Sequence, residues 1–154
     1  MTNLTTDVAI IMGSDSDLPI VEASFTILDS FGVNYTKNVM SAHRTPHEVM
    51  ELIKTSEKNG CKVFIAAAGM AAHLAGAVAA HSTRPVIGIP IESGGMGGMD
   101  SLLSTAMMPP GVPVATVAVG KAGAKNSAIL AVQILATSDD GLAEKLSEYK
   151  SNMR

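Results

Sequence analysis

The chain has 154 residues, a formal net charge of −3 and one cysteine, which together predict a single domain over residues 1–154 and exclude an internal disulfide. Because the sequence has no basic cluster, no basic N-terminal segment and no apolar run of about 20 residues, we expect a cytoplasmic protein without a nucleic-acid or membrane partner. Apolar residues make up 47% of the chain against 16% charged residues, and the mean hydropathy of +0.29 favours surface hidden in an oligomer.

Short runs rich in Val and Ile recur along the chain without polar alternation, as is typical of strands buried on both faces. They cover residues 8–12, 33–39, 63–68, 86–91 and 114–119. Helical patterns follow them at residues 18–31, 46–59, 71–82, 99–107 and 122–137. This β–α repetition predicts an α/β protein, a flavodoxin-like three-layer sandwich with a five-stranded parallel sheet.

Several residues mark where the first two helices begin and end. Thr45-Pro46-His47-Glu48 matches a capping box with proline at the first helical position, so the preceding Ser-Ala-His-Arg is predicted to be a loop. Ser16 or Asp17 is predicted to cap the first helix. Gly32 and Gly60 stand where left-handed residues end helices.

The last predicted helix contains SAILAVQILAT, residues 127–137, which is apolar almost all round. Such a helix is expected to pack one face on the sheet and another on a neighbouring subunit. A tightly packed monomer core is the alternative.

Glycines and polar side chains collect where the predicted strands end, which in an open α/β sheet is the edge that carries the ligand crevice. These segments are residues 13–17, 41–44, 69–73, 92–98 and 120–123. Glycine and serine loops that open onto helix N-termini suit a phosphate, and Arg44 adds a forked donor for its oxygens. The glycine-rich segment 93–98 is expected to act as a lid or to fit tightly against a substrate.

Three residues of these loops have both a structural and a functional interpretation. Asp17 suits ribose hydroxyls, or else only caps a helix. An unperturbed imidazole titrates near ~6.5, so His43 is the strongest candidate for proton transfer, although a lone loop histidine also serves as a surface or hydrogen-bonding residue. His73 is expected to point either into the crevice or at a neighbouring helix.

Other site classes lack their signatures in this sequence. The histidines show no metal-ligand spacing, so no metal site is expected. Ala122 after Lys121 excludes a P-loop, and no GxGxxG is present. Cys61 precedes the third strand, on the edge opposite to the crevice, and is interpreted as a packing residue.

Six motifs occur in the order and at the separations of a known enzyme family. They are MGSDSD (12–17), SAHRTP (41–46), AAHL (71–74), MDSLLS (99–104), MPPGVPVATVAVGKAGAKNSA (108–128) and ILA (134–136). With these motifs the chain resembles the N5-carboxyaminoimidazole ribonucleotide mutases (PurE class I) of de novo purine biosynthesis, also labelled the catalytic subunit of phosphoribosylaminoimidazole carboxylase.

The resemblance implies that residues 1–154 form one nucleotide-binding catalytic domain, which moves the carboxylate of its ribonucleotide substrate from N5 to ring carbon C4 without ATP, metal or organic cofactor. His43 would be the general acid and base. The implied substrate-binding residues are Ser14, Ser41 and Arg44 for the phosphate side, Asp17 for the ribose hydroxyls, and Gly69 and His73 from the third strand end. The family also implies a homo-octamer and functional coupling to the ATP-dependent synthetase that makes the substrate.

Two residues depart from the family pattern, since Met70 and Ala75 stand where its third-strand loop has glycine and proline. Direct carboxylation of aminoimidazole ribonucleotide with carbon dioxide is the alternative reaction; the retained AAHL motif favours the mutase. A non-catalytic flavodoxin-like module that binds a nucleotide or a flavin is a more distant alternative. An aromatic content of 3% argues against a flavin.

Overall fold

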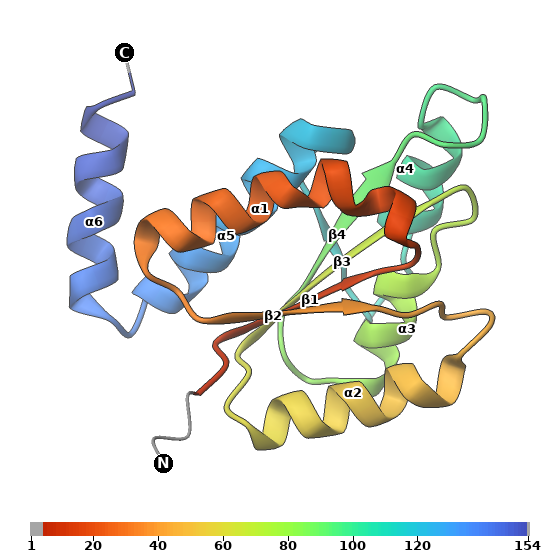
Figure 1. Cartoon of the computed structure of the whole chain (residues 1–154), viewed down its shortest axis with the longest axis horizontal. Coiled ribbons are helices and arrows are strands. Elements are labelled where there is room, and N and C mark those ends of the chain that lie inside the picture. Colours follow the sequence, from red (N-terminus) through yellow and green to blue (C-terminus); the bar gives the residue numbers. More distant parts are fainter. Residues whose placement is uncertain (1–4, 154) are drawn as a thin grey trace.

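The computed structural model describes residues 5–153, which form one sheet with helices on both faces (Figure 1). The elements are β1 (Val8–Met12), the short 3-10 helix η1 (Asp15–Asp17), α1 (Leu18–Phe31), β2 (Tyr35–Val39), α2 (Pro46–Lys58), β3 (Val63–Gly69), α3 (Leu74–His81), β4 (Val86–Ile91), α4 (Met99–Ala106), β5 (Ala115–Thr116), α5 (Gly120–Ala136) and α6 (Asp140–Ser151). None of the helices within residues 5–153 combines the length and the apolar character needed to cross a membrane.

The five strands are all parallel, in the order β2-β1-β3-β4-β5. The chain leaves β1 toward β2 on one side and returns to place β3 on the other side. This reversal creates a topological switch point between β1 and β3, where open α/β sheets bind ligands. The predicted five-stranded parallel α/β fold is therefore confirmed.

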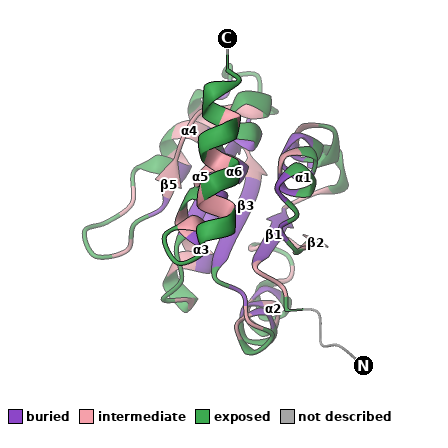
Figure 2. Cartoon of the chain, turned by 90° about the vertical axis from the view of Figure 1, so that its left-hand side faces the viewer, coloured by how far each residue is buried: buried purple, intermediate pink, exposed green. Residues whose placement is uncertain are grey.

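The core lies in two layers, one on each face of the sheet. Val8, Ile10 and Met12 of β1 pack with α1 and α5, whereas Ala9 and Ile11 pack with α2 and α3. Figure 2 shows the buried strands β1 and β3 between helices whose outer faces are exposed. Burial on both faces explains why these strands are apolar without alternation.

Several predicted elements are shorter than their sequence patterns: β2 begins at Tyr35 and not at residue 33, and β5 and α3 differ most. β5 covers only Ala115–Thr116 of the predicted 114–119, because the carbonyl of Val117 accepts a hydrogen bond from the Asn126 side chain and Ala118 has a positive φ of 138°. α3 begins at Leu74 and not at residue 71. The intervening residues form a turn that contacts α4.

The predicted helix caps need correction. Thr45 occupies the N-cap position of α2, but its hydroxyl donates to the Ser41 carbonyl (3.1 Å) and makes no capping bond. Neither Ser16 nor Asp17 caps α1 with its side chain; a capping box joins Ser14 to Asp17 around η1 instead. Gly32 does end α1 in the left-handed region, with φ 71°.

Helix α6 follows α5 and was not predicted from the sequence, so α5 is not the last helix. The N-cap of α6 is Asp139, whose carboxylate accepts the Leu142 amide (3.0 Å). Leu142, Leu146 and Tyr149 pack against the core, and Lys145 donates to the Phe31 carbonyl (3.0 Å) at the end of α1. Because α6 also contacts α5, the chain itself covers part of the apolar surface predicted to meet a neighbouring subunit.

Candidate active site

A cavity of about 590 Å³ opens at the carboxyl ends of β1, β2, β3 and β4. In Figure 1 the loops that follow these strands lie together at the carboxyl-terminal end of the sheet. All seven residues predicted for the site line this cavity: Ser14, Asp17, Ser41, His43, Arg44, Gly69 and His73. The fold therefore brings together residues that are up to 59 positions apart in the sequence, from Ser14 to His73.

The turn after β1 gives the cavity one polar wall. Its capping box consists of the Ser14 hydroxyl accepting the Ser16 amide (3.3 Å) and the Asp17 carboxylate accepting the Ser14 amide (3.1 Å). Asp17 is only 6% exposed, and desolvation raises the pKa of its carboxyl above the ordinary value, although the Ser14 amide acts in the opposite direction. A turn held in this way presents fixed polar groups to a ligand.

The turn after β2 is closed by its own hydrogen bonds. The Ser41 amide donates to the Thr45 hydroxyl (3.2 Å), and the Arg44 amide donates to the Ser41 hydroxyl (3.2 Å). These bonds fix the backbone on both sides of His43, while the His43 and Arg44 side chains remain exposed. Ser41 and Arg44 therefore offer a hydroxyl and a guanidinium to an anion from one short turn.

His43 and His73 contact each other across the cavity. Their Nε2 and Nδ1 atoms are 2.8 Å apart, and the rings meet edge to face with centroids separated by 4.9 Å. A hydrogen bond at this distance needs one N–H donor and one lone pair, so one of the two rings donates and the other accepts. His73 thus points into the crevice, the first of the two orientations that the sequence left open.

The ends of β3 and β4 approach each other closely at Gly69. A Cβ atom at this position would lie 2.0 Å from the Ser93 hydroxyl and 3.1 Å from the Ile91 carbonyl, so the site accepts only glycine in this arrangement. Ser93 also lines the cavity. The close contact explains why a glycine ends β3.

The cavity lining contains eight residues that were not predicted individually. The additional residues are Gly13, Ser16, Ala42, Ala68, Met70, Ala71, Leu74 and Ser93. Only Ala68 and Leu74 lie outside the strand-end segments predicted to carry the crevice, which are residues 13–17, 41–44, 69–73 and 92–98. These two side chains are apolar, so their position next to the predicted segment 69–73 was the available signal.

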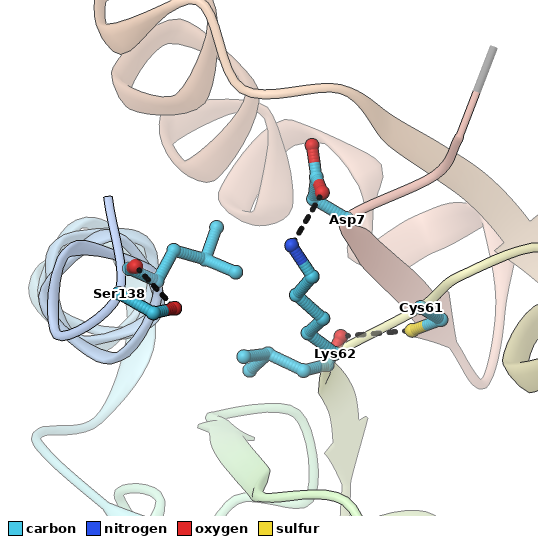
Figure 3. A network of polar contacts seen from close by, with 6 residues as sticks. Asp7, Cys61, Lys62 and Ser138 are labelled. Carbon is cyan, nitrogen blue, oxygen red and sulfur yellow. Dashed lines mark hydrogen bonds and ion pairs between the residues drawn. The ribbon is translucent and has the colours of Figure 1, made fainter. Parts of the chain in front are cut away.

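Other segments with chemical groups lie away from the cavity. Of the glycine-rich segment 93–98 only Ser93 lines it, and Lys121, where the sequence excluded a P-loop, does not. Cys61 lies at the opposite edge of the sheet, where Figure 3 shows its thiol donating to the Val63 carbonyl (3.3 Å) beside the Lys62–Asp7 ion pair (3.6 Å). Burial raises the pKa of this thiol to about 11, as befits a packing residue. Within residues 5–153 no group of three or more His, Cys, Asp or Glu is arranged to hold a metal ion.

Comparison with known proteins places the chain in a family. The sequence profile described as AIR carboxylase matches residues 7–154. The N5-carboxyaminoimidazole ribonucleotide mutase of Bacillus subtilis is 52% identical over 96% of this chain and 91% of its own length, and that of Pyrococcus abyssi is 50% identical over 96% and 83%. The crystal structure of Treponema denticola PurE superimposes with a TM-score of 0.85 and 31% identity, covering 94% of this chain and 89% of that one. The chain therefore belongs to the AIR carboxylase family and, within it, to the N5-carboxyaminoimidazole ribonucleotide mutases.

Proposed function

We propose that this chain converts N5-carboxyaminoimidazole ribonucleotide to 4-carboxy-5-aminoimidazole ribonucleotide in purine biosynthesis, with His43 as the general acid and base. The observation that carries the proposal is that, in a member of this family, one cavity holds both the His43–His73 pair and the Ser41–Arg44 turn. Its volume of about 590 Å³ lies within the usual range of small-molecule sites, about 300–1,000 Å³.

The polar side of the cavity would bind the nucleotide. Ser14, Ser41 and Arg44 would hold the 5′-phosphate, since hydroxyls, turn amides and a guanidinium are the donors that phosphate oxygens accept. Asp17 would accept hydrogen bonds from the ribose hydroxyls. The buried carboxylate faces hydroxyls better than phosphate, because it repels an anion at contact distance.

The reaction divides into two steps that use one proton carrier. In the first step the N5–carboxyl bond breaks, its electron pair stays on N5, His43 protonates N5 and neutral carbon dioxide is released within the cavity. In the second step C4 donates an electron pair to the carbon dioxide, and His43 removes the C4 proton, which restores the aromatic ring. His43 ends in its starting state, so the reaction needs no net acid or base.

His73 would position the proton carrier. Its ring lies 2.8 Å from His43 and fixes the orientation of that imidazole through the shared hydrogen bond. If both rings were protonated, both nitrogens would be donors and the contact would be lost. Gly69 would let the strand end approach the substrate closely.

We further propose that the enzyme works in the cytoplasm as a homo-octamer, functionally coupled to the ATP-dependent synthetase that supplies its carbamate substrate. The high apolar content of the chain and the exposed apolar side chains of α4 support association with further copies.

The test supplies the purified protein with N5-carboxyaminoimidazole ribonucleotide, without ATP or added metal, and follows the 4-carboxy isomer. We expect wild-type turnover, a loss of about 10²–10⁴-fold in kcat for His43→Asn, and unchanged affinity for the nucleotide. His47→Asn is the matched control, because His47 is an exposed histidine four residues away that does not line the cavity.

Two results would overturn parts of this proposal. Turnover of aminoimidazole ribonucleotide plus carbon dioxide, with no turnover of the carbamate, would replace the mutase by the direct carboxylase. Full activity of His43→Asn would remove His43 from the proton transfer.

A further inference from the structure

The motif MDSLLS, residues 99–104, forms most of α4 and contributes no residue to the cavity lining. Its last residue, Ser104, is nevertheless bonded to the turn that joins β3 to α3. The same turn leads directly into His73, which does line the cavity. Ser104 is therefore a contact through which this motif can act on the site without touching a substrate.

The Ser104 hydroxyl joins α4 to the backbone of this turn. Its oxygen accepts a hydrogen bond from the Ala72 amide (2.9 Å), and the Met70 carbonyl lies 3.2 Å from the same oxygen. The hydroxyl has a single hydrogen, and the Asp100 carbonyl, one helical turn earlier, is closer at 2.7 Å. Whichever carbonyl receives that hydrogen, the oxygen keeps a lone pair for the Ala72 amide, so this bond is present in either case.

The Ala72 amide depends on this bond. Ala72 is only 2% exposed, and buried backbone amides in folded proteins are paired with few exceptions. Among residues 5–153, no side chain other than Ser104 bonds the backbone of the turn 70–72. Removing the hydroxyl would leave a buried donor unpaired, and the turn would have to shift for this amide to reach another acceptor or water.

Such a shift would reach His73, because His73 follows Ala72 in the chain. The His73 amide donates to the Ala71 carbonyl (2.9 Å), and its carbonyl accepts the Ala77 amide in α3 (2.9 Å), so its backbone moves with the turn and the helix. Its side chain is exposed, so packing does not hold the ring. The 2.8 Å contact with His43 lies near the short end of the usual range of about 2.7–3.2 Å, and a displacement of about half an ångström would weaken it.

We propose that Ser104 is a positioning residue for proton transfer: its hydroxyl fixes the turn after β3 and thereby the place from which the His73 ring meets His43. The inference rests on the proposed function, in which His43 carries the proton. His43 has a local anchor, since Ser41 and Thr45 close the turn after β2. Ser104 supplies the corresponding anchor for His73 from a distant element, α4.

The first measurement concerns the histidine pair and needs no substrate. In the full chain labelled with ¹⁵N-histidine, in mildly alkaline buffer where imidazoles are neutral, the ring ¹⁵N signals report which nitrogens carry hydrogen. For wild type we expect one fixed tautomer each for His43 and His73, because one ring donates and the other accepts. For Ser104→Ala we expect averaged tautomers at these two rings, and unchanged signals for His47 and His81.

The second measurement is the split between kcat and KM with the carbamate substrate. We expect Ser104→Ala to lower kcat about 10–100-fold, because a small misplacement of a reacting group is costly. KM should stay near its wild-type value, since the residues proposed to hold the phosphate and the ribose lie in the turns after β1 and β2.

Two further substitutions test the hydroxyl itself. Ser104→Thr keeps a hydroxyl that can bond the preceding helical turn, and should restore both kcat and the fixed tautomers. Ser104→Cys provides a weaker acceptor for the Ala72 amide and should give intermediate values, so it also serves as a milder variant if Ser104→Ala does not fold.

Ser101→Ala is the matched control on the same helix. Ser101 is fully buried, and its hydroxyl donates to the Gly98 carbonyl (3.1 Å) and has no bond to the turn 70–72. This variant should lower the melting temperature but keep wild-type histidine signals and kcat. A general loosening of α4 would instead lower kcat in both variants.

The outcomes separate this inference from the function on which it rests. If wild type fails to convert the carbamate, the proposed function is wrong, and the histidine signals still decide whether Ser104 positions the pair. If Ser104→Ala keeps fixed tautomers and wild-type kcat, the positioning role is wrong. Equal losses of kcat in Ser104→Ala and Ser101→Ala, or no recovery in Ser104→Thr, would also contradict it.

Discussion

Asp17 keeps a carboxylate beside the cavity at a position where only 6% of the residue is exposed. Desolvation raises its pKa, so the folded chain binds this proton more tightly than the unfolded chain does. Stability is therefore highest below the unfolded-state pKa, falls as the pH rises toward the folded-state pKa, and stays at the lower level at neutral pH. The ionised Asp17 therefore lowers the stability of the fold at neutral pH, which is consistent with a role in binding.

We predict opposite effects of Asp17→Asn on stability and on binding. The amide oxygen can still accept the Ser14 amide without a buried charge, so the melting temperature at pH 7 should rise, and the gain should shrink in acid. Losing charge-assisted bonds to ribose should raise KM about 10-fold or more. Thermal unfolding at several pH values and steady-state kinetics measure both effects.

The control is Asp15→Asn, which removes an exposed carboxylate from the same turn. It should leave the melting temperature and KM near their wild-type values. A lower melting temperature of Asp17→Asn at neutral pH would show that the capping bond outweighs the burial of charge.

At the scale of elements, the junction of β3 and β4 depends on the absence of a side chain at Gly69. We predict that Gly69→Ala lowers the free energy of unfolding by about 1–3 kcal/mol, the usual cost of overpacking, and raises KM by moving Ser93. Chemical denaturation measures the first change and kinetics the second.

The chain offers both a matched control and a rescue for this substitution. A Cβ on Gly13, at the end of β1, would meet nothing closer than 3.8 Å, so Gly13→Ala should preserve stability. The double variant Gly69→Ala with Ser93→Gly removes the closest contact and should recover part of the lost stability. Equal destabilisation by Gly13→Ala and Gly69→Ala would rule out the close approach as the cause.

The elements that could be predicted from the sequence are those whose residue pattern follows from burial alone. β1 and β4 were placed to the residue, because burial on both faces requires uninterrupted apolar runs. The shortened β5, by contrast, depends on the Asn126 side chain binding the Val117 carbonyl, a contact between segments that no local pattern shows. For α6 a local signal existed: Asp139 as N-cap, followed by Leu142, Leu146 and Tyr149 on one face.

The residues of the candidate site that could be predicted are those with titratable or charged side chains. His43, Arg44 and Asp17 carry groups whose functions are known in advance, and the topology then predicts that their strand ends meet. Thr45 stands in the sequence pattern of a helix N-cap, but its hydroxyl donates to the Ser41 carbonyl. A threonine at a helix start can either cap the helix or bond a nearby backbone group, and the sequence does not decide between the two. Met70 stood out in the sequence only as a departure from the family pattern; its positive φ of 55° is a backbone feature that no local pattern shows.

At the scale of the whole molecule, α4 leaves an apolar face uncovered. Met99 and Leu103 are exposed on it, Met107 follows at its end, and Met96 precedes it. Contiguous exposed apolar side chains mark interaction surfaces in soluble proteins. This face gives the proposed octamer a place in which copies can meet.

We predict that light scattering after size exclusion gives a mass of roughly eight times the 15.8 kDa of one chain. Leu103→Glu places a charge on the exposed face of α4 and should lower the mass, because burying an unpaired charge opposes association. Thr55→Glu on the exposed surface of α2 is the control. A wild-type mass of one chain would contradict the octamer.

The parallel pairing of β1 with β3 also decides when the cavity can exist during synthesis. Val8 pairs with Val63, so two adjacent strands are separated along the chain by α1, β2 and α2. Such long-range pairing forms late and slowly. The cavity lining is complete only when the chain has been synthesised as far as Ser93. A ligand stabilises only the state that binds it. The nucleotide therefore stabilises the finished chain and gives no help to the nascent N-terminal half, which must reach its fold through its own apolar strands.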